Sequence, residues 1–381
     1  MIYVHVPFCR SFCTYCGFYS EMCSRAESQQ VQNRVFCAYT DAILDEIKLR
    51  FAAVPPAVNS PKTLYFGGGT PSVLPVEVLE RIVQALGPAE YEEFTVEVNP
   101  DDIVEKGVDY VRRLVAMGVN RVSMGVQSFD DGILRWMNRR HDAAEAREAF
   151  HILREGGVRN ISIDLIFGLS QLSESQWRAS IAEALTLGPE HISAYQLSIE
   201  EGSALEILVR DGRYAEASEE LCRRQYDILC ESLSRAGYSH YEVSNWAKPG
   251  FEAVHNSAYW RRVSYVGLGP GAHSFDAEKG VRLWNSEELA SYDGEGKLIR
   301  WTSAQEVLSA EEAAEERIML ALRTADGIPL EELYGCETLL GHGSTRVDGM
   351  LFDGVLVRNG FSVRIPEERF FVSDDIISAL I

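Results

Sequence analysis

Three cysteines lie close together near the start of the chain, where Cys9, Cys13 and Cys16 fall within the stretch PFCRSFCTYC (7–16). Structural zinc takes four ligands, usually as two pairs, and neither a second Cys-x2-Cys nor a His pair follows here. Three thiolates suit a [4Fe–4S] cluster, which leaves one iron open to a small bidentate ligand. The spacing therefore favours an iron–sulfur cluster over zinc, a chance grouping, or a site completed by Cys23.

Polar residues that could bind a ligand interrupt three apolar segments. Glu97 in TVEVNP, Gln127 in MGVQSF and Asp164 in ISIDLIFG each stand near the end of a strand-like run. Buried carboxylates are costly without a partner, so they predict a cationic ligand, with an internally satisfied polar network as the alternative. The GGGTPS stretch (67–72) lets the backbone approach a ligand closely or forms a tight turn. Arg139 offers a planar fork for a ligand carboxylate, or is a solvated helix end.

A repeating strand–helix pattern must position these residues. Short β-rich runs alternate with helical segments such as PVEVLERIVQALG and GVDYVRRLVAMG, each of which ends in glycine. Such alternation indicates an α/β fold with a parallel sheet, curled by right-handed crossovers into an open or partial barrel, or laid out as a flat doubly wound sheet. The carboxyl ends of the strands would carry the site. The predicted strands cover residues 2–8, 63–69, 94–100, 121–128, 161–168 and 191–198.

Composition narrows the function classes. The 381 residues carry a formal charge of −21, which argues against nucleic acid and anionic membranes as partners and leaves a small molecule or a basic protein. No apolar run approaches the roughly 18–20 residues that span a bilayer, and the N-terminus does not resemble a signal peptide. Eight unevenly spaced cysteines do not resemble a secreted disulfide framework. We therefore expect a cytoplasmic protein without a membrane anchor of its own.

Two further regions follow residue 205. Residues 206–308 are expected to form a connecting region, with one helix and loops rich in glycine and aromatic residues. Residues 309–381 begin with a capping box at Ser309 and contain Asn359-Gly360 between alternating strands, which predicts a hairpin. Helices followed by a hairpin suggest a small winged-helix-like domain. With 6 Arg, no Lys and 14 Asp or Glu, this domain is not expected to bind DNA.

The cysteine motif resembles that of the radical S-adenosylmethionine (SAM) superfamily, in which an aromatic residue commonly precedes the last cysteine, as Tyr15 does here. The resemblance implies that SAM chelates the open iron through its amino and carboxylate groups. One electron from the cluster would then cleave a carbon–sulfur bond of SAM to give a 5′-deoxyadenosyl radical. The resemblance also implies a partial (β/α)6 barrel, in agreement with the six strand–helix units.

A longer series of matches is similar to one branch, the oxygen-independent coproporphyrinogen III oxidase-like family. The matching stretches cover most of residues 1–205: YVHVPFCRSFCTYC, YFGGGTPS, VEVNP, RVSMGVQSF, IDLIFGL and SAYQLSIEEGS. The resemblance implies a cluster and SAM site lined by Tyr3, Cys9, Cys13, Tyr15, Cys16, Gly68, Gly69, Thr70, Glu97, Gln127, Arg139 and Asp164.

Two departures from the coproporphyrinogen dehydrogenases put that activity in doubt. Phe18 occupies the position of a further cysteine in those enzymes, and only eight residues precede Cys9, where they carry a substantial extension. HNSAYW (255–260) instead resembles the His-Asn-x-x-Tyr-Trp signature of the HemW haem chaperone branch. It implies that His255 is an axial ligand to haem iron. A packed loop histidine is the other interpretation, and His273 is an alternative ligand.

We therefore expect a haem chaperone that passes one haem to an acceptor protein, with a [4Fe–4S] cluster and SAM controlling this transfer. A membrane-bound respiratory enzyme is one such acceptor. The main alternative is an oxygen-independent coproporphyrinogen III oxidase, which would decarboxylate two propionates oxidatively; a radical SAM methyltransferase is a minor one. The sequence leaves open whether SAM is cleaved, how haem is attached, and whether the chain is a monomer or a dimer.

Overall fold

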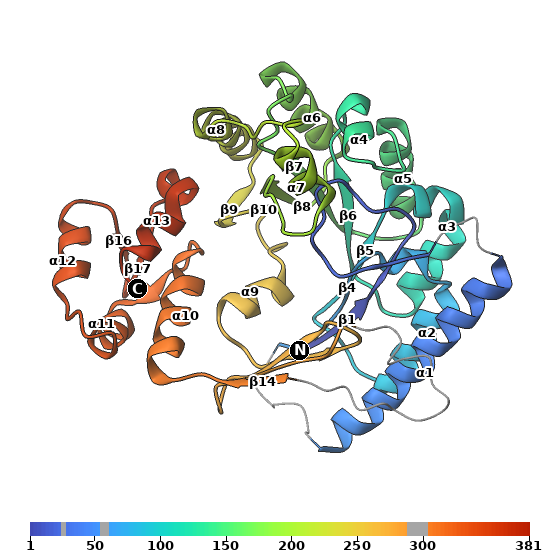
Figure 1. Cartoon of the computed structure of the whole chain (residues 1–381), viewed down its shortest axis with the longest axis horizontal. Coiled ribbons are helices and arrows are strands. Elements are labelled where there is room, and N and C mark those ends of the chain that lie inside the picture. The colour runs from blue at the N-terminus through green and yellow to red at the C-terminus, as the bar shows by residue number, and fades with distance from the viewer. Residues whose placement is uncertain (24–27, 54–60, 288–303) are drawn as a thin grey trace.

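A nine-stranded sheet forms the centre of the computed structural model, which describes residues 1–23, 28–53, 61–287 and 304–381. The strand order is β11-β1-β4-β5-β6-β7-β8-β10-β9 (Figure 1). Six neighbouring parallel strands confirm the six predicted ones: β1 (Ile2–Val6), β4 (Thr63–Gly68), β5 (Glu93–Val98), β6 (Arg121–Gln127), β7 (Asn160–Phe167) and β8 (His191–Gln196).

The edges of this sheet come from the region after residue 205. β11 (Val266–Leu268) pairs parallel to β1, whereas β10 (Asn245–Ala247) and β9 (Ser239–Glu242) add antiparallel strands beside β8. Within the described residues β11 and β9 are not paired with each other, so the barrel stays open. Three strands of the central sheet thus lie beyond the limit of residue 205 that the sequence predicts for the barrel domain.

Helices connect the parallel strands and lie on the outer side of the curved sheet (Figure 1). This arrangement is the partial barrel, because a flat doubly wound sheet has helices on both faces. The connecting helices are α1 (Gln29–Ala53), α2 (Val76–Leu86), α3 (Pro100–Ala116), α4 (Asp131–Trp136), α5 (Ala143–Glu155) and α6 (Glu174–Leu187). They are followed by α7 (Ala204–Arg210), α8 (Glu219–Arg235) and α9 (Val254–Trp260).

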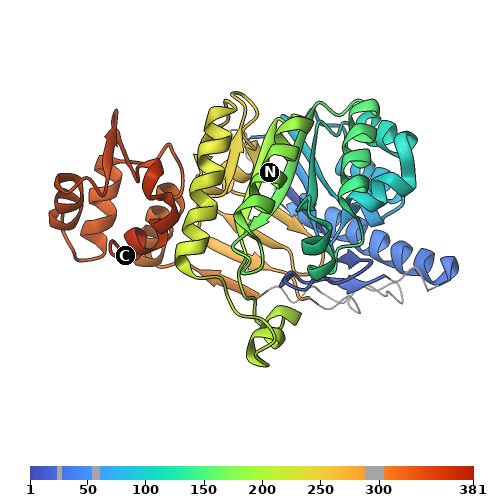
Figure 2. The same ribbon diagram turned by 90° about the horizontal axis from the view of Figure 1, so that it is seen from above.

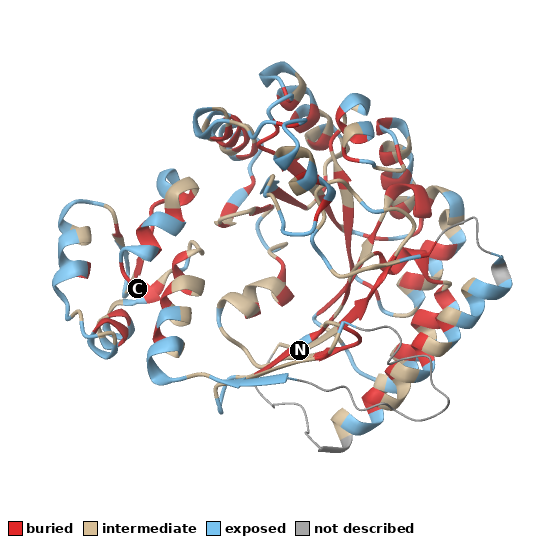
Figure 3. Ribbon diagram, in the orientation of Figure 1, coloured by how far each residue is buried: buried red, intermediate tan, exposed pale blue. Residues whose placement is uncertain are grey.

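Side chains on the parallel strands alternate between an apolar outer layer and a polar interior. Phe66, Val96 and Met124 are fully buried between the sheet and the helices, and Figure 3 shows such buried residues along the strands and the facing helix surfaces. Their neighbours in sequence, such as Glu97 and Ser123, point the other way because successive strand residues face opposite sides. The hydrophobic core therefore lies outside the barrel, and its interior is available for ligands.

A separate group of elements follows the barrel (Figure 2). A three-stranded sheet of β12 (His273–Asp276), β13 (Val281–Trp284) and β14 (Ala304–Val307) precedes it. The last elements are α10 (Ala310–Leu322), β15 (Ile328–Pro329), α11 (Leu330–Leu339), α12 (Thr345–Phe352), β16 (Val357–Asn359), β17 (Ser362–Arg364) and α13 (Ser373–Ser378). The predicted capping box at Ser309 and the predicted hairpin are both present. Helix–strand–helix–helix–hairpin is the order of a winged helix.

Among the described residues, none of the helices combines the length and the apolar character that crossing a bilayer requires.

Candidate functional site

The cysteine loop is held at the carboxyl ends of the strands by contacts with distant segments. Cys9 ends the short strand β2 (Phe8–Cys9), and Cys13 and Cys16 follow in the loop. Thr14 donates through its backbone N–H to the carbonyl of Met137 (3.0 Å) and through Oγ1 to that of Trp136 (2.9 Å). Its own carbonyl accepts from the N–H of Leu205 (2.7 Å) at the start of α7. The loop is thus fixed between α4 and α7.

The three thiols supply the type of donor that a [4Fe–4S] cluster takes. They lie near enough to influence one another electrostatically, and burial raises the pKa of the Cys9 thiol and brings that of Cys16 to about 11. In the described part of the chain, no three His, Cys, Asp or Glu side chains are arranged around a single metal ion. A cubane binds each thiolate through a different iron, so its ligands spread more widely than those of one ion. The donor set fits a cluster better than zinc.

Arg139 lies directly beside the cysteine loop. Its guanidinium donates to Sγ of Cys13 (3.2 Å), to Oδ1 of Asn99 (2.6 Å) and to the carbonyl of Gly125 (2.5 Å). The Nε atom is buried and has no hydrogen-bond partner among the described residues. A buried donor without an acceptor is unfavourable, so it is available to an acceptor such as a ligand carboxylate. The side chain is no solvated helix end; it is built into the site.

Glu97 and the glycine-rich stretch form one hydrogen-bonded unit. The carboxylate of Glu97 accepts from the hydroxyl of Tyr65 (2.8 Å) and from the backbone N–H of Gly68 (3.2 Å). Gly68 has a φ of +111°, and a Cβ atom there would lie 2.5 Å from the ring of His5. Thr70 follows and contacts Sγ of Cys9 at 3.4 Å. The glycines therefore let this loop pack between Glu97 and the cysteine loop.

Asp164 lies on β7, and the strand register places its side chain on the same side of the sheet as that of Glu97. Its two oxygens accept from the hydroxyl of Ser123, each at 3.2 Å. Burial raises the pKa of Asp164, and it raises that of Glu97 to about 7, with Asp164 as a further cause. Two buried carboxylates repel each other when both are ionised. A cationic ligand between them would remove this repulsion and lower both pKa values. Asp164 is also partly satisfied by serines, as the polar-network alternative expects.

Gln127 sits at an irregular strand end. The pairing of β6 with β7 shifts register between Gly125 and Gln127, and Gln127 has a φ of +68°, which is unfavourable for a residue with a side chain. A Cβ atom on Gly125 would lie 2.9 Å from the amide nitrogen of Gln127 and 3.4 Å from the guanidinium of Arg139. The bulge thus directs Gln127 towards Arg139, into space that only glycine at 125 leaves free.

The two predicted tyrosines lie on either side of this unit. Tyr3, on β1, bonds through its hydroxyl with Nδ1 of His5 (3.1 Å), and its ring is 6.1 Å from that of Tyr65. Tyr15 lies near Cys13 and Arg139, and burial raises its pKa. The predicted cluster and SAM residues are therefore brought together at the carboxyl ends of the strands, except that Tyr3 stands nearer to their middle.

His255 lies at the opposite end of the barrel. Its Nδ1 is 2.7 Å from Oγ1 of Thr63, the first residue of β4, and its Nε2 is 2.8 Å from the hydroxyl of Tyr259. Gly68 lies five positions after Thr63 on β4, which is roughly 16 Å of extended strand. The His255 side chain is 1% exposed, and burial lowers its pKa to about 3. As found, the imidazole is neutral and both nitrogens are occupied.

The interpretation of this motif as a loop is wrong, since residues 254–260 form helix α9. The first N–H groups of a helix lack internal partners. Here the side chain of Glu93 accepts from the N–H of Val254 (2.6 Å) and of His255 (3.4 Å), so a distant strand caps the helix. Helical spacing then places His255 and Tyr259 on the same face.

His273 has different surroundings. It is exposed at the start of β12, and its ring stacks on Trp284 with the centroids 5.9 Å apart. Within the described residues, its ring nitrogens have no hydrogen-bond partner. It lies near His5, which places it towards the carboxyl ends of the strands. Of the two histidines, His273 is therefore the accessible one, whereas His255 is the one held in a defined orientation.

Comparison with known proteins adds independent information about this arrangement. The model of the Radical SAM superfamily matches residues 3–184. "Heme chaperone HemW" of Lactococcus lactis is 32% identical over 334 residues, which covers 87% of this chain and 83% of that protein. The protein of the same name from Bacillus subtilis is 33% identical over 343 residues, which covers 87% and 86%. The chain belongs to the HemW family. Membership in the radical SAM superfamily implies a [4Fe–4S] cluster and SAM.

A solved structure supports the fold of this HemW family member. Coproporphyrinogen III oxidase (HemN) from Escherichia coli, described as a radical SAM enzyme, superposes with a TM-score of 0.76 at 20% sequence identity. The match covers 100% of this chain and 89% of that one. At this identity the likeness concerns the fold alone, and it agrees with the partial barrel.

Several residues of the site escaped the sequence analysis. Tyr65 bonds to Glu97, and Asn99 bonds to Arg139. Gly125 leaves room for Gln127, and Thr63 bonds to His255. A signal was present for those in strands, because TLYFG and RVSMG alternate between apolar and other residues with a period of two. In this protein of the HemW family, the residues that alternate with the apolar ones on these strands point into the barrel.

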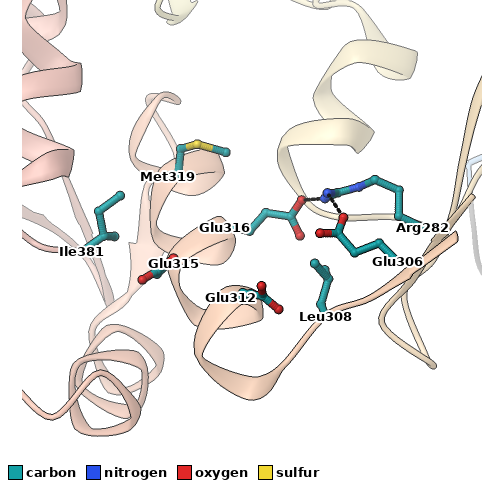
Figure 4. Close-up of a pocket in the computed structure, with 8 residues that line it drawn as sticks. All are labelled: Arg282, Glu306, Leu308, Glu312, Glu315, Glu316, Met319 and Ile381. Atoms are coloured by element: carbon teal, nitrogen blue, oxygen red, sulfur yellow. Dashed lines mark hydrogen bonds and ion pairs between the residues drawn. The ribbon is translucent and has the colours of Figure 1, made fainter. Parts of the chain in front are cut away.

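A pocket elsewhere in the structure does not coincide with these residues. It has a volume of about 320 Å³ and lies between β13, β14 and α10, where Arg282 bonds to Glu306 and Glu316 (Figure 4). Its lining consists of Arg282, Glu306, Leu308, Glu312, Glu315, Glu316, Met319 and Ile381. Four glutamates make this pocket a poor receptor for the propionates of haem, and none of the predicted site residues belongs to it.

The raised pKa of Glu97 predicts a pH-dependent stability. Because the folded protein holds this proton up to about pH 7, whereas the unfolded chain releases it near pH 4.5, stability should fall as the pH rises through that interval. Glu97→Gln should therefore be more stable than the wild type at pH 8, by up to about 3 kcal/mol, and similar to it at pH 4. Urea unfolding of the cluster-free protein at both pH values measures this difference. The exposed Glu201→Gln is the control, and an equal effect of pH on both variants would contradict the prediction.

Proposed function

We propose that the protein is a haem chaperone of the HemW kind, which binds one haem and transfers it to an acceptor protein. The identity with "Heme chaperone HemW" proteins over 87% of the chain carries this proposal. Cys9, Cys13 and Cys16 would hold a [4Fe–4S] cluster, and SAM would bind beside it. The acceptor would be a haem protein, including membrane-bound respiratory enzymes.

The chain's own residues would bind and orient SAM. When bound, the cluster would supply one electron to SAM. Glu97 and Asp164 would meet the positive charges of SAM, and the free Nε of Arg139 would meet its carboxylate. Gly69 and Thr70 would keep the glycine-rich loop in place. The N–H of Gly69 donates to the carbonyl of Val6 at the end of β1 (2.8 Å), and Thr70 contacts Cys9 in the cysteine loop. Further contacts would come from Tyr3, Tyr15, Gly68 and Gln127.

His255 would bind the iron of haem through Nε2. Iron-binding histidines usually donate their other ring N–H to a neighbouring acceptor, which fixes the tautomer. Thr63 can accept this hydrogen bond from Nδ1. Nε2 then has the hydroxyl of Tyr259 as its hydrogen-bond partner, which haem iron would have to displace. Breaking one neutral hydrogen bond costs about 1 kcal/mol, which is small beside the roughly 8 kcal/mol of a micromolar affinity. Helix α9 must move outward in the same step, because His255 is buried.

Thr63→Val should weaken haem binding about tenfold, as is typical when a residue that orients a metal ligand is lost. The variant keeps the shape of the side chain and removes only the acceptor of Nδ1. Titration of haem, followed by the Soret band, measures the change in Kd. Thr40→Val removes a buried hydroxyl on α1 and should leave the Kd unchanged. Equal affinities for Thr63→Val and wild type would contradict the role of Thr63.

The proposal is tested on the wild-type protein, reconstituted without oxygen. Stable uptake of haem and its release to a haem-free acceptor are expected. The alternative, oxidative decarboxylation, predicts protoporphyrinogen IX after incubation with SAM, a reductant and coproporphyrinogen III. Phe18, at the position of a cysteine in those enzymes, is 75% exposed and cannot replace a thiol. Formation of that product over many turnovers, or no haem uptake, would overturn the chaperone function.

A further inference from the structure

We infer that Tyr65 positions residues of two separate sites and thereby couples haem binding to SAM binding. This inference rests on the proposed function and adds a residue that links its two ligands. Tyr65 lies on β4 between Thr63 and the glycine-rich loop, and its side chain is on the same side of the sheet as that of Glu97. Its ring contacts the imidazole of His255, and its hydroxyl donates to Glu97.

The contact with His255 involves the ring of Tyr65. The two ring centroids lie 5.0 Å apart at an interplanar angle of 31°. Tyr259 contacts the same imidazole edge-on, with the centroids 4.9 Å apart. His255 is thus enclosed by two tyrosine rings, and movement of the imidazole towards a haem iron must change the packing of Tyr65.

The contact with Glu97 involves the hydroxyl of Tyr65. This hydroxyl bonds to Oε1 of Glu97 at 2.8 Å, and Oε2 of the same carboxylate accepts from the N–H of Gly68 at 3.2 Å. A Cβ atom on Gly67 would lie 2.8 Å from the ring of Tyr65 and 2.9 Å from Glu97. The three residues are therefore packed without free space, and a shift of Tyr65 reaches the loop that would hold SAM.

The direction of the coupling follows from charge. A positive group of SAM at Glu97 competes with the hydroxyl of Tyr65 for the carboxylate, because a hydrogen bond between two opposite charges is stronger than one in which only the acceptor is charged. Release of that hydroxyl frees the Tyr65 ring to move away from His255, which makes release of the imidazole easier. Bound SAM should therefore tighten haem binding, and by thermodynamic linkage haem should tighten SAM binding by the same factor.

Two binding titrations measure this factor in the cluster-containing protein without reductant, so that SAM stays intact. The Kd for haem is measured with and without saturating SAM, and the Kd for SAM with and without haem. We expect a decrease of about five- to twentyfold in each, within the usual range of coupling between sites. In Tyr65→Phe, which keeps the ring and loses the hydroxyl, the factor should fall to about one while haem alone still binds.

Tyr238→Phe is the matched control, because it removes a buried hydroxyl that bonds to the carbonyl of Pro189, outside the barrel interior. It should keep the coupling of the wild type. A wild-type factor of one or less, or full coupling in Tyr65→Phe, overturns the inference and leaves the chaperone function intact. Absence of haem binding in the wild type would instead overturn the proposed function. Thermal unfolding of both variants verifies that they are folded.

Discussion

Cys13→Ser should lose the iron–sulfur cluster, so that iron falls from about four atoms per chain to background after anaerobic reconstitution. Serine is a poor ligand for iron in such clusters, and two remaining thiolates cannot hold a cubane with three anchored corners. Cys13 also accepts the hydrogen bond from Arg139, so the variant disturbs the residue that lies beside the cluster. Iron analysis and the visible absorbance of the cluster measure the loss.

Cys37→Ser is the matched control for this prediction. Cys37 is exposed on α1 and lies outside the cysteine loop, so its replacement should leave the iron content unchanged. An electron paramagnetic resonance signal after reduction with dithionite should be present in the wild type and the control alone. Full iron and an unchanged spectrum in Cys13→Ser, or stoichiometric zinc in the wild type, would refute the cluster assignment.

His255→Ala should weaken haem binding by about two orders of magnitude, which corresponds to roughly 2.8 kcal/mol. The change removes the proposed iron ligand, whereas Thr63 and Tyr259 keep their hydroxyls. Because those hydroxyls then lack their partner, some loss of stability is expected as well, and the unfolding temperature must be measured beside the affinity. The Soret band during a haem titration reports both the affinity and the axial ligand.

His273→Ala distinguishes the two histidines. His273 is exposed and stacked on Trp284, so its loss should change neither the fold nor, if His255 is the ligand, the Soret maximum. The reverse result, with normal binding by His255→Ala and loss in His273→Ala, would move the haem site to the carboxyl end of the barrel, beside the cysteine loop. It would also remove the basis for coupling through Tyr65.

Local patterns in the sequence determined the cysteine motif, the six strand–helix units and the hairpin at Asn359-Gly360. Each of these depends on residues close together in the chain: three thiols within one loop, a period of two or 3.6, or a two-residue turn. Glu97, Gln127 and Asp164 were also recognisable, because polar residues in apolar strands are conspicuous. The family resemblance added the ligands expected at these residues but not the contacts among them.

Only the tertiary structure decided how the chemical groups are combined. Arg139 reaches Cys13 across 126 residues, and Thr63 meets His255 across 192. No local periodicity encodes such pairs, because they depend on which strands become neighbours and on where each strand ends. Helix α9 was missed for the same reason, since Glu93 on a distant strand satisfies its first N–H groups. The separation of the His255 and cysteine ends of the barrel likewise follows from the parallel direction of the strands.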